Sequence, residues 1–545
     1  MGIRGYELVG RALAQAGADT AFFIMGGPMN DALNCARDHG VRLIDVRHEQ
    51  AAALMAQAYA RMRGTPGLCI GASGPGTINL TTGLANALVD CAPVVALGGA
   101  SPLTEFGTGS FQEIDQLAIM RPVTKWAERV HETRRIPELI ARAFREAMAG
   151  RPGPVYLDLP GDVLYGTVEE ADVVWPRPLD LRPPAASAEA IASCLALLKA
   201  AKRPVLLSGS GILWSGAADR LARFVEATGI PLYTTPQGRG ITREDAPGSF
   251  PLARSTAYRE ADLVLVLGTR LSYVFSQGKA PRFSPDATFV MINTDPEAIV
   301  SAARVDLGIV GDAGLVVDQL SQAVAGQISP DRFAPWRDRL KAIEDKKKPA
   351  AEAELSTDAV PIHPLRLCRE IRDIIDPQTI LVVDGQEILN YGRQSIPSHL
   401  PGHRLNSGPF GTMGVGLPFG VGAKAARPDK TVLVLHGDGS FGLNAMELDT
   451  AVRHGLPILV VISLNGGWTA DPERTKPGRD LGYTRFDRMA EALGCHGEFV
   501  ERPEDIRPAL ERGAAEVARG RTAVVNVVTD WRARAGTVSF TAHST

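Results

Sequence analysis

Two oxygen-bearing side chains in the last third of the chain stand where they could hold a metal ion. Asp438 lies just past the apolar run 432–435, and Asn465 lies just past the apolar run 458–462. If both runs are parallel strands joined by one crossover, their ends meet in one crevice. Carboxylate, amide and carbonyl oxygens suit Mg²⁺. The pattern predicts a magnesium site, although Gly437-Asp438-Gly439 alone is also a common turn between a strand and a helix.

The glycines beside Asp438 would let backbone amides approach an anionic ligand. A helix beginning at this point adds a favourable dipole, so the segment is suited to phosphate groups. We expect one helix and a turn over 441–457, between the two strands. The sequence therefore predicts a metal-bridged diphosphate held at the carboxyl edge of a parallel sheet.

A second candidate group lies near the N-terminus. Glu49 begins an alanine-rich segment, and residues 50–63 have the pattern of a helix. A glycine-rich loop follows at 73–79, containing Ser73 and Asn79. Glu49 could simply be an acid that complements the helix dipole. It could also be a buried proton carrier, and its type and position alone leave both readings open.

Together these segments resemble the thiamine diphosphate (ThDP) enzymes. The stretch from Gly437-Asp438-Gly439 to Asn465 is similar to the metal–diphosphate motif of that family, with Leu464 in place of its first asparagine. The segment 47–61 resembles the family's glutamate helix, and 73–79 its Ser-Gly-Pro-Gly loop. The segment 407–416 resembles the loop that bends the cofactor.

The resemblance implies a role for each of these residues. Asp438, Asn465 and the carbonyl of Gly467 would bind Mg²⁺, and Glu49 would activate the aminopyrimidine of ThDP. Met413 would wedge the cofactor into a bent shape, and the Gly411 carbonyl would accept from its amino group. The expected cofactor-binding residues are Glu49, Ser73, Asn79, Gly411, Met413, Gly437, Asp438, Gly439, Ser440, Asn465, Gly467 and Trp468.

The resemblance covers nearly the whole chain and points to the branch of the family that holds acetohydroxyacid synthase, oxalyl-CoA decarboxylase and 2-hydroxyacyl-CoA lyase. Two local features help to choose among these members. Phe111-Gln112 stands where the decarboxylases have Tyr-Glu, which argues against a decarboxylase. The loop 466–474 lacks the Gly-Met-Val and Gln-Trp residues of the synthases, and its Asn-Gly-Gly is similar to that of the CoA-thioester enzymes. The resemblance therefore favours a lyase that cleaves a 2-hydroxyacyl-CoA, with the decarboxylase second and the synthase third.

Lyase chemistry needs a proton acceptor that decarboxylation does not need, because a ketone leaves only when its hydroxyl proton is removed. Glu473 and Asp471 are the candidates in the chain, and Gln112 could hydrogen-bond the thioester oxygen or the hydroxyl. Phe111 and Trp468 would shape the pocket for the alkyl part. Arg404 and Asn406 could contact CoA phosphate, or they could be solvated surface residues.

The middle of the chain resembles the nucleotide fold that holds ADP in oxalyl-CoA decarboxylase. Arg270, Asp295 and Asp312 are the expected ADP contacts, with Asp295 at the end of a strand where it could accept from ribose hydroxyls. A nucleotide fold that binds nothing is the alternative, and FAD is a weaker one. The last residues, 531–545, contain Trp531, Arg532 and Arg534 and could form a lid over the substrate or a frayed end.

These motifs must be positioned by three α/β domains. Buried-strand runs alternate with helical patterns throughout, which indicates doubly wound parallel sheets. Proline-rich residues near 180 and a charged segment from 327 to 364, with a short solvated helix, suggest two linkers. We expect a pyrimidine-binding domain over 1–178, a central nucleotide-binding-like domain over 187–327, a diphosphate-binding domain over 355–530 and a tail over 531–545.

The composition limits the class of protein. The chain has 545 residues and a formal net charge of −3, which gives no basic surface for nucleic acid. No run approaches the roughly 20 apolar residues of a membrane span, and the ends carry no export or peroxisomal signal. The six separated cysteines are typical of a reduced, cytoplasmic enzyme. The resemblance adds an acyl-CoA substrate and a homodimer or homotetramer with the active sites between subunits.

Overall fold

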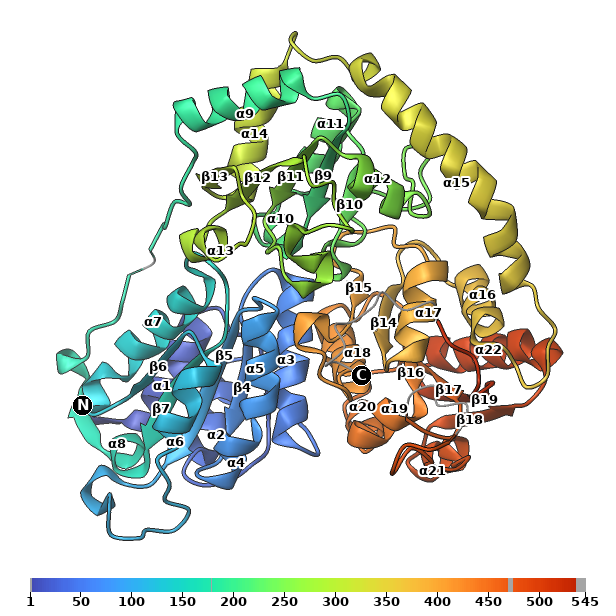
Figure 1. Cartoon of the computed structure of the whole chain (residues 1–545). Helices are drawn as coiled ribbons and strands as arrows, with labels where there is room; N and C mark the ends of the chain where they lie inside the picture. The colour runs from blue at the N-terminus through green and yellow to red at the C-terminus, as the bar shows by residue number, and fades with distance from the viewer. Residues whose placement is uncertain (1, 178, 469–473, 536–545) are drawn as a thin grey trace.

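The computed structural model describes residues 2–177, 179–468 and 474–535 and contains three parallel-sheet domains flanked by helices (Figure 1). The N-terminal domain is blue in the figure, the central domain green and the C-terminal domain orange to red. This confirms the predicted fold class. The exact domain limits given above remain predictions.

The N-terminal sheet has the strand order β3-β2-β4-β5-β7-β6, and every pair is parallel. Its helix α3 is the helix predicted over residues 50–63. Its elements are β2 (Thr20–Phe23), β3 (Arg42–Asp45), β4 (Gly67–Gly71), β5 (Val94–Ala100), β6 (Trp126–Arg129), β7 (Val155–Pro160), α1 (Gly5–Gln15), α2 (Asn30–Asp38), α3 (Glu49–Arg63), α4 (Pro75–Asn79), α5 (Thr81–Val89), α6 (Gln116–Met120), α7 (Ile136–Met148) and α8 (Gly161–Tyr165). A small antiparallel pair, β1 (Gly2–Arg4) and β8 (Thr167–Glu169), flanks them.

The central sheet has the order β10-β9-β11-β12-β13, again fully parallel. Both faces carry helices, as its uninterrupted apolar strands predict. The elements are β9 (Pro204–Ser208), β10 (Leu232–Thr234), β11 (Leu263–Leu267), β12 (Thr288–Asn293), β13 (Leu307–Val310), α9 (Ala188–Ala200), α10 (Ser210–Trp214), α11 (Ala218–Thr228), α12 (Arg254–Glu260), α13 (Pro296–Val300) and α14 (Ala313–Val324).

The C-terminal sheet has the order β15-β14-β16-β17-β19-β18. Strands β16 and β17 are adjacent and parallel, so the segments after them lie at the same edge, as predicted. The elements are β14 (Ile380–Asp384), β15 (Arg404–Leu405), β16 (Val432–Gly437), β17 (Leu459–Leu464), β18 (His496–Val500), β19 (Ala523–Val528), α16 (Pro364–Ile374), α17 (Glu387–Ser395), α18 (Gly416–Ala426), α19 (Asp438–Asn444), α20 (Glu447–Arg453), α21 (Phe486–Ala492) and α22 (Pro503–Ala518).

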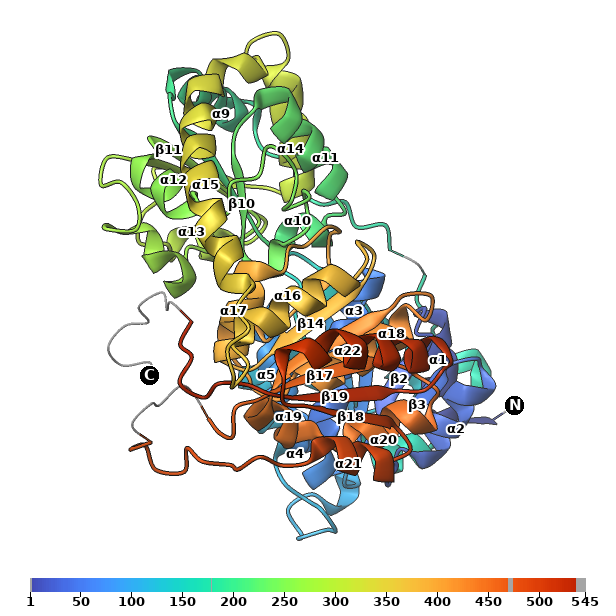
Figure 2. The same cartoon turned by 90° about the vertical axis from the view of Figure 1, so that its right-hand side faces the viewer.

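Helix α3 packs against α18, which joins the N-terminal and C-terminal domains into one apolar core (Figures 1 and 2). The approach is close, because a side chain at Gly422 on α18 would lie 2.3 Å from the carbonyl oxygen of Met55 on α3. Alanines line this face of α3 and allow the contact. The helix that begins with Glu49 is therefore held rigidly against the domain that carries Asp438.

The charged segment after the central domain differs from the prediction of a short solvated helix. It forms α15 (Ala334–Leu355), a helix of 22 residues that runs along the outside of the molecule and contains Pro349 (Figure 2). Trp336, Leu340 and Leu355 are buried at its two ends. Tertiary contacts at the ends therefore extend the helix beyond what its polar middle indicates.

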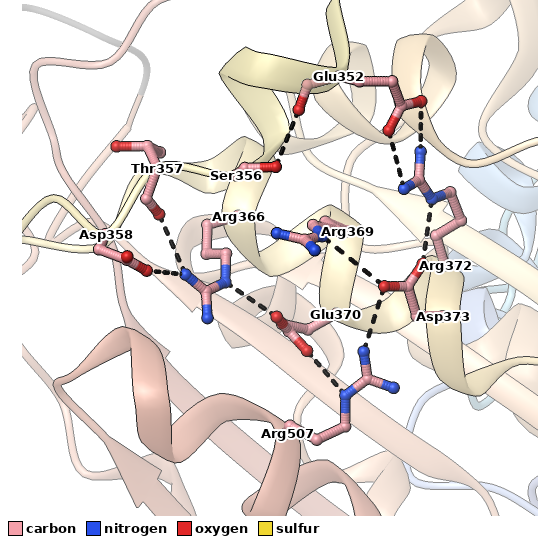
Figure 3. A network of polar contacts seen from close by, with 10 residues as sticks. All are labelled: Glu352, Ser356, Thr357, Asp358, Arg366, Arg369, Glu370, Arg372, Asp373 and Arg507. Carbon is pink, nitrogen blue, oxygen red and sulfur yellow. Dashed lines mark hydrogen bonds and ion pairs between the residues drawn. The ribbon is translucent and has the colours of Figure 1, made fainter.

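The end of α15 is tied to the C-terminal domain by arginines and acids, drawn in Figure 3. Glu370 of α16 pairs with Arg366 at 2.9 Å and with Arg507 of α22 at 2.7 Å. Glu352 of α15 pairs with Arg372 of α16 at 3.0 Å. These contacts join α15, α16 and α22 and orient the connection between the domains.

The segment 441–457, expected to be one helix and a turn, contains most of α19 and all of α20. Asn444 ends α19 by donating from Nδ2 to the carbonyl oxygen of Gly414 at 2.8 Å. Glu447 begins α20 and turns toward the N-terminal domain. No strong helix breaker stands between them, so tertiary hydrogen bonds, which a sequence pattern does not reveal, cause the break.

None of the described helices is long and apolar enough to cross a membrane. All six cysteines are free; Cys35 and Cys91 are partly buried and the other four are buried, in keeping with the expected reduced thiols.

Candidate active site

Glu49 stands at the first position of α3, with little of its side chain exposed. His48 caps the helix by accepting from the backbone of Gln50, and the αL residue Gly64 ends it. The Glu49 carboxylate accepts from Nδ2 of Asn79 at 3.0 Å, and Gly76 leaves room for it, since a side chain there would lie 3.2 Å from Oε1. The structure thus brings together two predicted residues around α4.

Ser73 and Gln112 meet beside the same helix. The Ser73 hydroxyl donates to Oε1 of Gln112 at 2.5 Å. Gln112 has a φ of +61°, a left-handed conformation that costs about 1–2 kcal/mol for a residue other than glycine. Gly74 lies against it, and a side chain at 74 would collide with the Gln112 carbonyl oxygen at 2.5 Å. Strain of this kind is typical of functional sites and holds Gln112 beside the glycine-rich turn.

Asp438 is the centre of the second group. Its Oδ1 accepts from the amide of Gly439 at 2.8 Å, and its Oδ2 accepts from the amides of Gly466 and Gly467 at 2.7 and 3.1 Å. The carboxylate therefore joins the ends of β16 and β17, as predicted. Burial raises its pKa to about 6, and the backbone amides oppose that shift.

The loop after β17 completes this group. Oδ1 of Asn465 accepts from the amide of Gly467 at 3.2 Å, and Gly466 has a φ of +74°. Trp468 lies over Gly439, where a side chain would meet its ring at 2.6 Å. The atoms that could bind a metal ion here are hard oxygens of Asp438 and Asn465, and backbone amides lie beside them. These residues therefore fit a Mg²⁺–diphosphate group. Glu473 and Asp471 lie outside the described residues.

The loop 407–416 is anchored to the C-terminal sheet. The amide of Gly416 donates to Asp384 at 2.9 Å, and Asn444 holds the carbonyl of Gly414. Burial raises the pKa of Asp384 to about 6. The sequence analysis did not identify Asp384. Its position at the end of an apolar strand could have indicated it, because ligands of such sheets bind at the strand ends.

A cavity of about 1990 Å³ lies between the three domains. Gly411 and Met413 line one part of it, and Arg270 and Asp312 of the central domain line another. It therefore joins the expected wedge residue to the carboxyl edge of the central sheet, where ligands of such domains bind.

The three expected ADP contacts have different environments. Asp312 caps α14 through the amide of Leu315 at 3.0 Å, and Arg270 donates to the Val89 carbonyl at 2.5 Å. Asp295 does not end a strand, because β12 stops at Asn293; it caps α13 and pairs with Arg151 at 3.1 Å. Each side chain thus already has a structural partner, and its role toward a nucleotide stays a prediction.

None of the four residues expected in the substrate pocket lines the described cavity: Phe111, Arg404, Asn406 and Trp468. Arg404 and Asn406 are 2% and 1% exposed, so they are not solvated surface residues. Phe111 is 86% exposed on the N-terminal domain.

Glu447 connects the C-terminal domain to the segment just before Glu49. The sequence analysis did not identify this residue. Its carboxylate accepts from the amides of Arg47 at 3.1 Å and His48 at 3.2 Å, directly before Glu49. It also accepts from Thr450 at 2.6 Å. A glutamate on a helix gives no sequence signal for a contact about 400 residues away. Glu447 fixes the start of α3 against α20.

We expect Glu447→Gln to make stability less dependent on pH. Burial raises the pKa of Glu447 to about 7, above an unfolded value of about 4.3. The protonated form therefore stabilises the fold at low pH, and this contribution is lost as the pH rises through 7. Melting curves from pH 5 to 8 should show a loss in the wild type that exceeds that of the variant by about 1–3 kcal/mol. Parallel curves would show that Glu447 does not titrate in this range.

The start of the C-terminal tail lies against the loop after the metal motif. The Trp531 ring is contacted by Arg474, whose guanidinium carbon is 4.3 Å from its centroid, and by Arg479 at 5.7 Å. The amide of Ala535 donates to Glu387 at 2.9 Å. Residues 536–545 lie outside the described part of the chain, so the expected lid stays a prediction.

Comparison with known proteins agrees with this site. Three family models of thiamine pyrophosphate (TPP) enzymes match the chain. They are the N-terminal TPP binding domain over residues 3–119, the central domain over 191–320 and the C-terminal TPP binding domain over 390–527. Thiamine pyrophosphate and ThDP are the same cofactor.

Relatives with three different names match almost the whole chain. A 2-hydroxyacyl-CoA lyase of Oryza sativa subsp. japonica is 35% identical, with 97% of this chain and 96% of the relative covered. The acetolactate synthase large subunit IlvG of Mycobacterium tuberculosis is 33% identical, with 96% and 95% covered. The oxalyl-CoA decarboxylase of Escherichia coli K12 is 31% identical, with 96% and 95% covered. The chain therefore belongs to the thiamine pyrophosphate enzymes and lies near 2-hydroxyacyl-CoA lyases and oxalyl-CoA decarboxylase.

Proposed function

We propose that this protein is a ThDP-dependent carbon–carbon lyase that cleaves a 2-hydroxyacyl-CoA into formyl-CoA and an aldehyde or ketone. With 2-hydroxyisobutyryl-CoA the products would be formyl-CoA and acetone, and the reverse reaction is a condensation. The observation that carries the proposal is the cavity of about 1990 Å³ that reaches from Met413 to the central domain. ThDP would fill the part of the cavity beside Met413, and ADP the part beside Arg270 and Asp312. The space that remains suits a long CoA thioester better than a small keto acid.

Residues of the N-terminal and C-terminal domains would hold the cofactor and carry its proton. Bound ThDP supplies a carbon nucleophile and an electron sink. Glu49, oriented by Asn79, would hold and return a proton at the aminopyrimidine. Asp438, Asn465 and the Gly467 carbonyl would hold Mg²⁺ on the diphosphate. Met413 and the Gly411 carbonyl would support the bent form of the cofactor.

Proton handling decides between the lyase and the decarboxylase. In the lyase reaction the C1–C2 bond breaks, the hydroxyl proton leaves the departing ketone, and the acyl carbon gains a proton. Gln112, held by Ser73, would hydrogen-bond the thioester oxygen or the hydroxyl. Glu473 or Asp471 would accept the hydroxyl proton, and Trp468 and Phe111 would border the alkyl group.

A second copy of the chain is part of the proposal. The described contacts of Glu49 with Asn79 and Gly76 lie in its own domain, and Phe111 of the same domain is exposed. Exposed apolar side chains also stand around the metal motif, among them Leu443, Met446 and Tyr483. Pairing these surfaces between copies would bury both and bring Glu49 to a partner's Asp438, in a homodimer or homotetramer.

Two alternatives have support of their own. An oxalyl-CoA decarboxylase would use the same cavity, and a relative of that name matches 96% of this chain. An acetolactate synthase is favoured by a relative of similar identity. ADP binding at Arg270 and Asp312 stays part of the proposal, since both line the cavity.

A substrate comparison tests the proposal. Holoprotein would be given 2-hydroxyisobutyryl-CoA, oxalyl-CoA and pyruvate in separate reactions, and kcat/KM measured for each. We expect the hydroxyacyl-CoA to be preferred by at least about tenfold, because only it uses both the cavity and the extra proton acceptor. Preference for oxalyl-CoA would make the protein a decarboxylase, and acetolactate from pyruvate would make it a synthase.

A further inference from the structure

A buried carboxylate stands where the three domains meet. Asp90 directly follows helix α5 of the N-terminal domain, is 4% exposed and lines the cavity between the domains. Its Oδ2 accepts from Nε2 of Gln57 on α3 at 2.9 Å, and Nη1 of Arg61 on the same helix lies 3.7 Å from that oxygen. Asp90 is therefore tied to α3, the helix that packs against α18.

Arg61 supplies the counter-charge of Asp90. The two side chains are 2% and 1% exposed. Burial raises the pKa of Asp90 to about 6, and the charges of Arg61 and Arg270 oppose that shift. A buried ion pair contributes little net stability, because both ions lose their hydration. Stability alone therefore does not account for the presence of this pair.

The other oxygen of Asp90 lies against the start of the loop 407–416. A side chain at Gly408 would lie 2.5 Å from Oδ1 of Asp90 and 2.7 Å from Nε2 of Gln237, which is too close for any carbon atom. Gly408 has a φ of +65°, a conformation that glycine adopts readily and other residues rarely do. Gly408 is thus fitted between the N-terminal and central domains.

Hydrogen bonds complete this arrangement around Gly408. Its amide donates to Oδ1 of Asn406 at 2.9 Å, and Nε2 of Gln237 donates to the Asn406 carbonyl oxygen at 3.2 Å. Nη2 of Arg61 donates to the Gln237 carbonyl oxygen at 2.9 Å. Arg61 therefore contacts both of the residues that enclose Gly408. All three domains contribute to the position of this glycine.

The far end of the loop is fixed by a different buried acid. Asp384, at the end of β14, accepts from the amide of Gly416 at 2.9 Å. Asp384 belongs to the same domain as the loop, whereas Asp90 belongs to another domain. Gly411 and Met413 stand between the two anchors, and both line the cavity. Their placement therefore depends on Asp90 as well as on their own domain.

We propose that Asp90 is a positioning residue, which through Gly408 sets the start of the loop 407–416 and with it the placement of Gly411 and Met413 on bound ThDP. It acts through the loop and not on a reacting atom. This inference rests on the part of the proposed function that places ThDP beside Met413. It is independent of which thioester or keto acid reacts.

Asp90→Asn tests the positioning role with little change of shape. The new NH₂ group would face the Nε2 donor of Gln57 or displace the oxygen at Gly408, and Arg61 would lose its counter-charge. We expect ThDP affinity at saturating Mg²⁺, measured by calorimetry, to fall by at least about tenfold. Hydrogen–deuterium exchange of peptides covering 407–413 should become faster in the full-length protein without cofactor.

Two further variants address the same contact from other sides. Adding Gln57→Glu to Asp90→Asn reverses their hydrogen bond, and the new carboxylate stands four residues before Arg61 on α3, where it can pair with it. This double variant should recover most of the ThDP affinity and the slow exchange. Gly408→Ala leaves the ion pair intact but places a methyl group 2.5 Å from Asp90, so it should weaken ThDP binding as Asp90→Asn does.

Two control variants separate positioning from general loss of stability. Glu370→Gln breaks another buried contact between an acid and arginines, the one between α16 and α22 in Figure 3. Gly455→Ala adds a methyl group at a glycine with a φ of +59° where nothing lies within 4 Å. Both should keep the ThDP affinity and the loop exchange of the wild type, even where Glu370→Gln lowers the melting temperature.

The outcomes separate this inference from the proposed function. Unchanged ThDP affinity in Asp90→Asn and Gly408→Ala would overturn the inference, whether or not loop exchange is faster. An equal loss of affinity in Glu370→Gln would overturn it too. The proposed function fails separately, when wild-type protein binds ThDP but does not cleave 2-hydroxyisobutyryl-CoA. If the melting curve shows that Asp90→Asn does not fold, Gly408→Ala decides the test.

Discussion

Replacing Glu49 with glutamine is expected to reduce turnover about 100- to 10,000-fold while ThDP and Mg²⁺ still bind. Glutamine keeps the shape of the side chain and an oxygen that can accept from Asn79, which donates to Glu49 at 3.0 Å. It cannot carry the proton that the aminopyrimidine needs. Turnover of the best substrate and exchange of the cofactor's C2 hydrogen with deuterium would both measure the loss.

The control for this prediction is Glu132→Gln, which changes an exposed acid of the same domain that pairs with Arg134. It should leave turnover and deuterium exchange at wild-type values. ThDP affinity, followed by quenching of tryptophan fluorescence, should be similar in all three proteins. Full activity of Glu49→Gln would show that α3 carries its glutamate only as a helix-capping acid.

Replacing Asp438 with asparagine is expected to weaken ThDP binding by more than about 100-fold, because a metal ligand is lost. The structure adds a second reason. Both oxygens of Asp438 accept from backbone amides, so either orientation of an asparagine would point its NH₂ group at another donor. The loop 465–467 would lose its anchor together with the metal. Calorimetry with ThDP at several Mg²⁺ concentrations measures this effect.

Asp429→Asn is the matched control, because Asp429 is an exposed acid in the turn before the same strand. Its ThDP affinity should equal that of the wild type. Tight, Mg²⁺-dependent ThDP binding by Asp438→Asn would remove Asp438 from the metal site. A melting curve without cofactor separates loss of binding from loss of the fold.

The fold and the metal motif could be predicted because each depends on local patterns. Continuous apolar strands indicate parallel sheets, and residues directly after such strands must gather at one edge. Asp438 and Asn465 satisfy this rule, and the structure joins both to the amide of Gly467. Glu49 and Asn79 came from resemblance, and their contact is a geometric finding of the structure.

The remaining features depend on contacts between distant segments. Glu447 turns toward residues 47 and 48, and this contact divides the predicted single helix into α19 and α20. Arg404 is charged and follows a polar turn, yet it is buried because Arg239 and the Ile396 carbonyl lie above it. Periodicity and composition carry no information on such pairs.

The central claim is tested most directly by adding ThDP and Mg²⁺ to cofactor-free protein in the presence of 2-hydroxyisobutyryl-CoA and following both products by mass. We expect formyl-CoA and acetone in equal amounts, and only when both cofactors are present. Neither product forming, while ThDP and Mg²⁺ are bound, would contradict the lyase assignment.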